Sequence, residues 1–281
     1  MSIKVSNLTY VYMKGTPFEK LALDNINLSI ETGEFIGIIG HTGSGKSTLV
    51  QHFNGLLKPT SGSVYINGEE LTGKKAKELK RQVGIVFQYP EHQLFEETVY
   101  RDIAFGLVKR GENKEEIDKK IRKTVSMLGL SEDILDKSPF ELSGGQKRRV
   151  AMAGILVLEP SILILDEPAA GLDPRGRDEI FELISNLHKN NKMTVVLVSH
   201  SMEDVAKYVG RVIVMNRGRI EMCGPVRNVF SNIDDLERIG LAAPQITYLM
   251  KKLKEKIPEI NDNVLTVTEA KEELTKYIRK A

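Results

Sequence analysis

One short segment constrains the fold more than any other: residues 40–47 read Gly-His-Thr-Gly-Ser-Gly-Lys-Ser. The segment follows five apolar residues, Phe35 to Ile39, which are typical of a strand buried on both faces of a parallel sheet. A helical pattern starts at Lys46. The pattern G-x-x-x-x-G-K-[ST] between a buried strand and a helix predicts a phosphate-binding loop. A Gly-rich turn without a ligand would explain the glycines but not these flanks.

The residue types in this loop suit a nucleoside triphosphate. Glycines let the backbone curl so that several N–H groups point at phosphate oxygens. The positive end of the following helix faces the same anion, Lys46 adds a full charge, and the Ser47 hydroxyl can ligate Mg²⁺. We therefore expect the nucleotide to contact Gly40, His41, Thr42, Gly43, Ser44, Gly45, Lys46, Ser47 and Thr48.

Two adjacent carboxylates follow a second buried strand. Residues 162–165 read Ile-Leu-Ile-Leu and precede Asp166 and Glu167. Charges at the end of a buried strand need a partner or a role, and successive strand side chains point to opposite sides. Asp166 is the predicted Mg²⁺ ligand, and Glu167 is predicted to face a water that attacks the γ-phosphate. For the segment taken alone, two solvated charges opening a loop are an alternative, since Pro168 follows.

Buried strands and helices alternate along much of the chain. Apolar runs at 83–87, 162–165 and 194–199 are separated by helical patterns that include 46–57 and 178–189. This alternation predicts an α/β fold built on a P-loop NTPase core, with a RecA-like parallel sheet.

Three other parts of the chain depart from that pattern. Residues 63–66 before Asn67-Gly68, together with earlier alternating segments, predict an N-terminal antiparallel β subdomain. Residues from about 91 to 158 have helical patterns only and predict an inserted helical subdomain. We expect a nucleotide-binding domain over 1–230 and a charged C-terminal helical extension over 231–281, which would support a dimer.

Composition excludes several functional classes. The 40 basic and 38 acidic residues give a net charge of +2, so no nucleic-acid partner is expected. The single cysteine, Cys223, excludes internal disulfides and a Cys-rich metal site. The longest apolar run, 150–158, is far shorter than the roughly 20 residues of a membrane span. We therefore expect any membrane role to be peripheral.

A third motif makes the sequence resemble a known family. Residues 142–146 read Leu-Ser-Gly-Gly-Gln directly before a helical run, which predicts a second helix N-terminus suited to an anion. With this order of motifs, residues 1 to about 230 resemble the nucleotide-binding subunits of ATP-binding cassette (ABC) transporters. The resemblance implies ATP and Mg²⁺ as cofactors and a head-to-tail dimer. In that dimer Ser143, Gly144, Gly145 and Gln146 of one subunit face the ATP held by the other.

The resemblance also implies roles for single residues. Tyr12 resembles the aromatic residue that stacks on adenine, and Tyr10 is the less favoured choice. Gln88 resembles the Q-loop glutamine, Asp173 lies in a segment that resembles the D-loop, and His200 resembles the switch histidine at the γ-phosphate. The implied catalytic residues are Lys46, Gln88, Glu167 and His200, and the implied metal ligands are Ser47, Gln88 and Asp166.

One segment resembles a particular branch of the family. Residues 87–95 read Phe-Gln-Tyr-Pro-Glu-His-Gln-Leu-Phe, similar to the ATPases of energy-coupling factor (ECF) transporters, which include the cobalt and nickel importer subunits. Residues 166–174 resemble the second of the two ECF ATPase paralogues. The resemblance implies an importer of vitamins or transition-metal ions at the cytoplasmic face of the cell membrane.

The same resemblance implies several partners. A second ECF ATPase paralogue would complete the dimer, although pairing with itself stays open, and a separate membrane subunit would bind the cargo. A transmembrane T component would contact Gln88–Phe95, with Leu94 and Phe95 as apolar anchors. Glu91, Glu96 and Glu97 could accept hydrogen bonds from arginines of that component, and a solvated face is the alternative for Glu96 and Glu97.

Three alternative functions compete with this interpretation. A cassette ATPase acting in translation or DNA repair would usually carry two cassettes or a long insertion, but the gap between Gln88 and Leu142 is short. A phosphotransferase would not explain residues 142–146. An ordinary ABC importer or exporter subunit is the third alternative, and the pattern at residues 90–95 argues against it.

Overall fold

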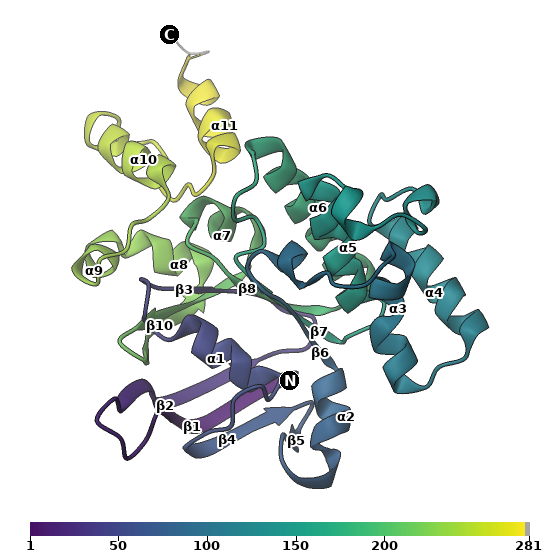
Figure 1. Ribbon diagram of the computed structural model, residues 1–281. Helices are drawn as coiled ribbons and strands as arrows, with labels where there is room; N and C mark the ends of the chain where they lie inside the picture. The colour runs from purple at the N-terminus through teal and green to yellow at the C-terminus, as the bar shows by residue number, and fades with distance from the viewer. Residues whose placement is uncertain (279–281) are drawn as a thin grey trace.

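The computed structural model describes residues 1–278, so the last three residues of the predicted extension lie outside the described residues. A six-stranded sheet of order β10-β9-β3-β8-β7-β6 forms the centre (Figure 1). The five strands from β9 to β6 run parallel, and β10 pairs antiparallel with β9. This confirms the predicted α/β fold with a parallel sheet. The strands are β3 (Phe35–Ile39), β6 (Val83–Val86), β7 (Ile162–Asp166), β8 (Thr194–Val198), β9 (Arg211–Asn216) and β10 (Arg219–Pro225).

Strands β3, β7 and β8 are apolar apart from Asp166 and Thr194 at strand ends, because both faces of the sheet are covered. Ile36 and Ile38 of β3 pack into a cluster with the N-terminal sheet, whereas Phe35 and Ile39 pack into the cluster on the other face. β7 and β8 alternate in the same way. All five residues of each of these three strands are buried, so the sheet holds its strand ends rigidly.

The N-terminal part forms the second, antiparallel sheet, as predicted. Its order is β2-β1-β4-β5, and Asn67-Gly68 forms the hairpin turn between the last two strands. Helix α1 (Lys46–Phe53) ends four residues before the end of the predicted run 46–57, because Gly55 takes a left-handed φ of 68°. The remaining strands are β1 (Ile3–Tyr12), β2 (Lys20–Ile30), β4 (Ser61–Ile66) and β5 (Glu69–Glu70).

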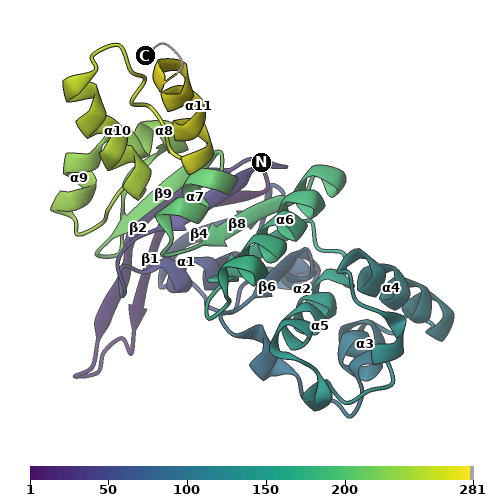
Figure 2. The ribbon, with the colours of Figure 1, turned by 90° about the horizontal axis from the view of Figure 1, so that it is seen from above.

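Helices fill the chain between β6 and β7, where the sequence predicts an insertion. They lie at one end of the molecule and the C-terminal helices at the other (Figure 2). Ile103, Ile121 and Met152 of three of these helices share one buried cluster. The elements are η2 (Pro90–Gln93), α3 (Val99–Arg110), α4 (Lys114–Met127), η3 (Glu132–Ile134), η4 (Pro139–Glu141) and α5 (Gly144–Leu156); η1 (Gly73–Lys75) and α2 (Ala76–Arg81) precede β6.

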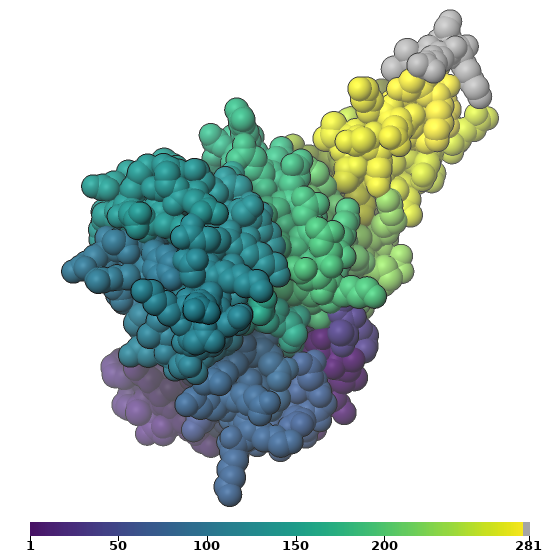
Figure 3. Space-filling view, turned by 90° about the vertical axis from the view of Figure 1, so that its right-hand side faces the viewer, coloured from purple at the N-terminus to yellow at the C-terminus, as the bar shows by residue number. Residues whose placement is uncertain are grey.

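The C-terminal part contains two kinds of packing. Phe230 and Leu236 belong to the main core, whereas Met250 and Ile260 belong to a separate small core. The last helices project from the body (Figure 3). The division at residue 230 stays a prediction. The helices after β7 are α6 (Pro174–Asn191), α7 (Met202–Tyr208), α8 (Val226–Ser231), α9 (Ile233–Arg238), α10 (Gln245–Lys256) and α11 (Val267–Ile278).

Within residues 1–278, none of the helices combines the length and the apolar character that a membrane crossing needs.

Candidate nucleotide site

The ends of four neighbouring parallel strands meet at one cavity of about 520 Å³. Residues 40–47 follow β3 and His200 follows β8. Asp166 ends β7, Glu167 directly follows it, and Gln88 follows β6. Parallel strands present their carboxyl ends at the same edge, which is where α/β proteins bind ligands. The cavity is lined by Tyr12, Lys20, Leu21, Ala22, Thr42, Gly43, Gly45, Lys46, Ser47, Thr48, Gln88, Asp166, Glu167, His200, Arg217 and Gly218.

The loop between β3 and α1 has a backbone that only glycine can adopt at two tight positions. Gly40 has φ 155° and Gly45 has φ 106°. A Cβ at Gly40 would lie 2.4 Å from the Met215 carbonyl oxygen, and a Cβ at Gly45 would lie 2.8 Å from that of Ala22. Both clashes are with backbone atoms, so the loop would have to move. The glycines therefore keep the loop curled against β9 and β2.

The Lys46 side chain is held in place by backbone carbonyl groups of the loop. Its Nζ donates to the carbonyl oxygens of Gly40 at 2.7 Å and His41 at 3.1 Å. Burial lowers the pKa of this ammonium, while the nearby Glu167 and Asp166 carboxylates act to raise it. A buried cation in a Gly-rich loop at the N-terminus of a helix fits a phosphate.

Two other loop residues clarify how the loop can bind an anion. The Ser44 hydroxyl is buried, and no described residue hydrogen-bonds to it. The His41 ring is turned aside: Nδ1 lies 2.8 Å from the Thr42 carbonyl oxygen and Nε2 lies 3.2 Å from Asn216 Oδ1. His41 can therefore offer the ligand its backbone N–H.

Asp166 and Ser47 form the part of the site that fits a magnesium ion. Asp166 is 9% exposed. Burial raises the pKa of its carboxyl, while the Ser47 hydroxyl and the charges of Lys46 and His200 act to lower it. Residues 1–278 contain no group of three His, Cys, Asp or Glu side chains that could hold a metal. Mg²⁺ usually takes one or two carboxylates together with substrate phosphates, so this donor set suits Mg²⁺ bound with a nucleotide.

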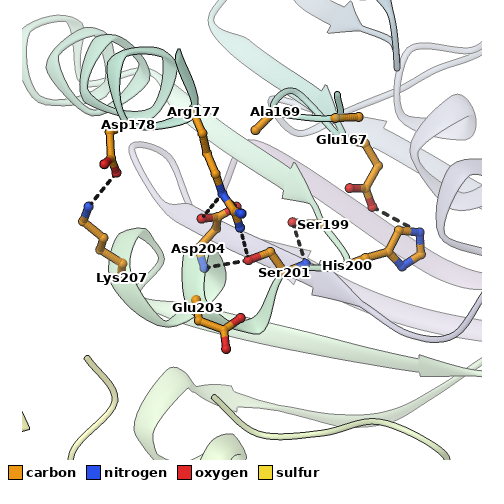
Figure 4. Close-up of a pocket in the computed structure, with 11 residues that line it drawn as sticks. Glu167, Ala169, Arg177, Asp178, Ser199, His200, Ser201, Glu203, Asp204 and Lys207 are labelled. Atoms are coloured by element: carbon orange, nitrogen blue, oxygen red, sulfur yellow. Dashed lines mark hydrogen bonds and ion pairs between the residues drawn. The ribbon is translucent and has the colours of Figure 1, made fainter. Parts of the chain in front are cut away.

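Glu167 combines an unusual backbone with an unusual pKa. Its φ of 54° lies in the left-handed region, a conformation that costs about 1–3 kcal/mol and persists where the surroundings enforce it. Burial raises the pKa of its carboxyl to about 7. The His200 Nε2 lies 3.3 Å from Glu167 Oε1 (Figure 4). A carboxyl that titrates near neutrality is suited to exchange a proton with water.

The aromatic residue at the cavity is Tyr12. Its hydroxyl lies 3.1 Å from Thr48 Oγ1, and the residue is 37% exposed. Tyr10 instead stacks edge-on against His52, with ring centroids 4.8 Å apart, and packs on the core. Of the two candidates, the structure brings only Tyr12 to the cavity.

Lys20 and Arg217 also line the cavity, and the sequence analysis missed both. Arg217 lies in the turn between β9 and β10, where Gly218 N donates to the Ser44 carbonyl oxygen at 2.9 Å. The sequence marks residues 216–218, Asn-Arg-Gly, as a turn between two strands. Locating it at the cavity needs the strand order.

The motif at 143–146 and Asp173 do not line this cavity. Ser143 caps α5: Gln146 N donates to the Ser143 hydroxyl at 3.3 Å, and Ser143 N donates to the Gln146 side chain at 3.0 Å. Asp173 caps α6 by accepting from Gly176 N at 2.7 Å.

A second cavity of about 640 Å³ adjoins Glu167 and His200 (Figure 4). Arg177 of α6 donates to both carboxylate oxygens of Asp204 in α7, with Nε 2.8 Å from Oδ1 and Nη2 2.6 Å from Oδ2. The same guanidinium donates to the Ser201 hydroxyl. These bonds tie the residue after His200 to the two helices that line the cavity.

Known proteins with similar sequences agree on the family. A family model described as "ABC transporter" matches residues 23–170. The chain is 86% identical, over all of both chains, to "Energy-coupling factor transporter ATP-binding protein EcfA2" of Acetivibrio thermocellus. It is 58% identical to the protein of the same name in Clostridium tetani, over 98% of this chain and 97% of that one.

Solved structures agree as well. cbiO1 from Clostridium perfringens, described as part of the ABC transporter complex cbiONQ, matches with a TM-score of 0.75 at 41% identity, over 89% of this chain and 98% of that one. A dimeric, post-hydrolysis ATP-binding cassette bound to ADP and Pi matches with a TM-score of 0.71 at 32% identity, over 80% and 98%. The chain therefore belongs to the ABC transporter family and, within it, to the ATP-binding proteins of energy-coupling factor transporters.

Proposed function

We propose that this chain is the ATP-hydrolysing subunit of an ECF importer and that the cavity between β3 and β7 is its ATP site. The observation that carries the proposal is the convergence of four strand ends, which brings a buried lysine, a buried and a half-buried carboxylate, a histidine and a glutamine to one cavity. Binding and hydrolysis of ATP would drive uptake of a vitamin or transition-metal ion through membrane partners.

Each residue has a distinct task in this proposal. Lys46 and the loop N–H groups bind the phosphates, and Tyr12 stacks on the adenine ring. Glu167 orients the attacking water and accepts its proton, while His200 donates a hydrogen bond toward the γ-phosphate. Ser47, Asp166 and Gln88 would hold Mg²⁺, which neutralises charge on the β- and γ-phosphates when bound.

The motif at 143–146 and Asp173, which do not line the cavity, support a head-to-tail dimer. The N-terminus of α5 carries the positive end of a 13-residue helix and lies outside the chain's own ATP site. In a dimer with an ECF ATPase paralogue, Ser143–Gln146 would complete the partner's site and Asp173 would face it. Loss of the γ-phosphate would then remove the charge that joins the subunits.

The segment Gln88–Phe95 is the proposed docking site for the transmembrane T component, at the cytoplasmic face of the membrane. Phe95 is 59% exposed, and its ring lies 5.0 Å from that of the exposed Phe105. Leu94, expected as a second anchor, is buried in the chain's own core. Exposed aromatic side chains are typical anchors of protein interfaces.

The variant Glu167→Gln tests the hydrolytic role. It should bind ATP with unchanged affinity, because the loop and Lys46 are intact, and it should hydrolyse ATP about 10²–10⁴-fold more slowly because the proton acceptor is gone. Phosphate release and equilibrium ATP binding, measured on the same preparation, separate the two effects. Turnover near that of the wild type would remove Glu167 from the catalytic role.

A further inference from the structure

Arg148 is a buried charge that lies at the junction of three segments. Its Nε donates to Glu91 Oε2 at 3.1 Å and its Nη2 donates to Glu91 Oε1 at 3.0 Å. Its Nη1 donates to the Pro168 carbonyl oxygen at 3.2 Å. The Arg148 side chain is 3% exposed and that of Glu91 is 18% exposed. We call Arg148, Glu91 and Pro168 the clasp.

Each member of the clasp belongs to a different part of the proposed machinery. Glu91 lies in η2, three residues after Gln88 and inside the proposed docking segment. Arg148 lies in α5, two residues after Gln146. Pro168 directly follows Glu167. One guanidinium therefore joins the docking segment, the helix of the Leu-Ser-Gly-Gly-Gln motif and the loop that carries the proposed catalytic carboxylate.

The chemistry of the clasp requires arginine. The planar guanidinium can donate to both oxygens of one carboxylate and to a third acceptor at fixed angles. Burial alone would raise the pKa of Glu91, but the hydrogen bonds and charge of Arg148 lower it, so the pair is charged. A lysine ammonium would keep the charge but could not span the three acceptors in this geometry.

The backbone on both sides of the clasp is held in an uncommon conformation. Tyr89 has φ 55° and Glu167 has φ 54°. A Cβ at Gly171 would lie 3.4 Å from the Tyr89 ring, so the two loops also meet outside the clasp. Left-handed non-glycine residues persist where neighbouring contacts enforce them, and the clasp supplies such contacts two residues from Tyr89 and one residue from Glu167.

We propose that Arg148 is a positioning residue for Glu167 and that it transmits the position of the docking segment to the catalytic loop. A displacement of η2 moves Glu91, which moves the guanidinium and with it the carbonyl of Pro168 and the adjacent Glu167. The proposal rests on the catalytic role given above to Glu167. Hydrolysis then depends on the clasp, whereas ATP affinity, set by the loop after β3, does not.

The test compares two arginines of the same helix. Arg149 also donates to a carboxylate and a carbonyl, those of Glu179 at 2.5 Å and Leu128 at 3.4 Å, but it touches neither the docking segment nor the Glu167 loop. Arg148→Lys and Arg149→Lys are introduced into the full-length chain, and each is purified with its membrane subunits. The kcat and KM for ATP are measured alongside thermal unfolding.

Arg148→Lys should lower kcat by about tenfold to a hundredfold, because a misplacement of about 1 Å in a catalytic group costs this much. Its KM for ATP should stay within about twofold of the wild type, and Arg149→Lys should change kcat by no more than about twofold. Equal kcat values for the two variants, or a loss confined to KM, would overturn the proposal.

A second variant tests whether Glu91 and Arg148 act on hydrolysis as one unit. Glu91→Gln keeps one oxygen acceptor for Arg148, and the double variant Glu91→Gln/Arg148→Lys closes a mutant cycle. If the clasp acts as a unit, the double variant loses no more kcat than the worse single variant. Losses that multiply would refute coupling. If Glu167→Gln hydrolyses ATP slowly but Arg148→Lys is fully active, the role of the clasp is rejected and the proposed function stands. If Glu167→Gln is active, the proposed function itself is rejected.

Discussion

The Nε2 of His200 lies 3.3 Å from Oε1 of Glu167, across the ends of the neighbouring strands β8 and β7. That carboxylate oxygen is buried and has no hydrogen bond among the described residues, whereas the imidazole is 54% exposed. The histidine therefore closes the solvent side of the carboxylate. Burial raises the pKa of Glu167 to about 7, which leaves the group able to lose or take a proton near neutral pH.

The raised pKa of Glu167 predicts a pH-dependent gain in stability for Glu167→Gln. The pKa of this carboxyl is 4.5 in the unfolded chain and about 7 in the folded one. Between pH 4.5 and about pH 7 the folded wild type therefore binds more protons than the unfolded chain, and its free energy of unfolding falls as pH rises. Glutamine cannot ionise. The nucleotide-free variant should exceed the wild type by on the order of 3 kcal/mol at pH 8, and this advantage should vanish by about pH 4.5.

Thermal unfolding at several pH values from 4.5 to 8 measures this difference. Glu182→Gln is the matched control for the substitution itself, because Glu182 is exposed on α6. If the difference in free energy of unfolding between Glu167→Gln and the wild type were the same at pH 5 and pH 8, the burial argument would be contradicted.

Lys46→Ala should lose most of the affinity for ATP. The variant removes the buried cation that lies on the loop carbonyls, and a hydrogen bond to a charged group contributes about 1.5–3 kcal/mol. The dissociation constant should therefore rise about tenfold to a hundredfold. Calorimetric titration measures it, with Lys75→Ala, a surface lysine paired with Glu69, as the control. Undiminished binding would refute the assignment of Lys46 and the loop after β3 as the phosphate site.

Tyr12→Ala should weaken ATP binding, whereas Tyr12→Phe should not. The ring supplies a stacking surface worth about 1–3 kcal/mol per base, and the hydroxyl contacts only Thr48 among the described residues. Tyr10→Phe should bind ATP like the wild type, because Tyr10 packs on His52. A nucleotide that fluoresces on binding provides the titration. If Tyr12→Ala bound as tightly as Tyr12→Phe, the adenine would lie elsewhere.

Ser143→Ala should lose stability and hydrolysis, while Asn113→Ala should lose only stability. Each side chain caps a helix by accepting from the backbone N–H three residues later, and removing a cap costs about 1 kcal/mol. Only Ser143 lies in the motif proposed to face the partner's ATP. Thermal unfolding and steady-state ATPase rates distinguish the effects. Equal ATPase rates in the two variants would argue that the motif acts only as a cap.

The motifs could be predicted from the sequence because their chemistry is local. The phosphate loop, the carboxylates after β7 and the helix starts depend on residues close together in the chain. The buried strands were also identifiable, since both faces of the sheet are covered and successive residues therefore need to be apolar.

Long-range pairs could not be predicted in this way. Glu91 was a candidate acceptor for arginines of a partner, but the structure pairs it with Arg148, 57 positions away in the chain. Glu97 also pairs within the chain, but locally, with Arg101 four positions later. Lys20 and Arg217 reach the cavity only through the order of strands and the β9–β10 turn. Such contacts follow from how the elements pack, which one sequence does not encode in any short pattern.

Capture of the tagged full-length chain from detergent-solubilised native membranes tests the central claim most directly. Mass spectrometry of the co-purifying proteins should find a polytopic membrane protein and a second cassette ATPase, and a further small membrane subunit would indicate the cargo. Recovery with ribosomes or DNA, or without any membrane protein, would contradict the role in an ECF importer.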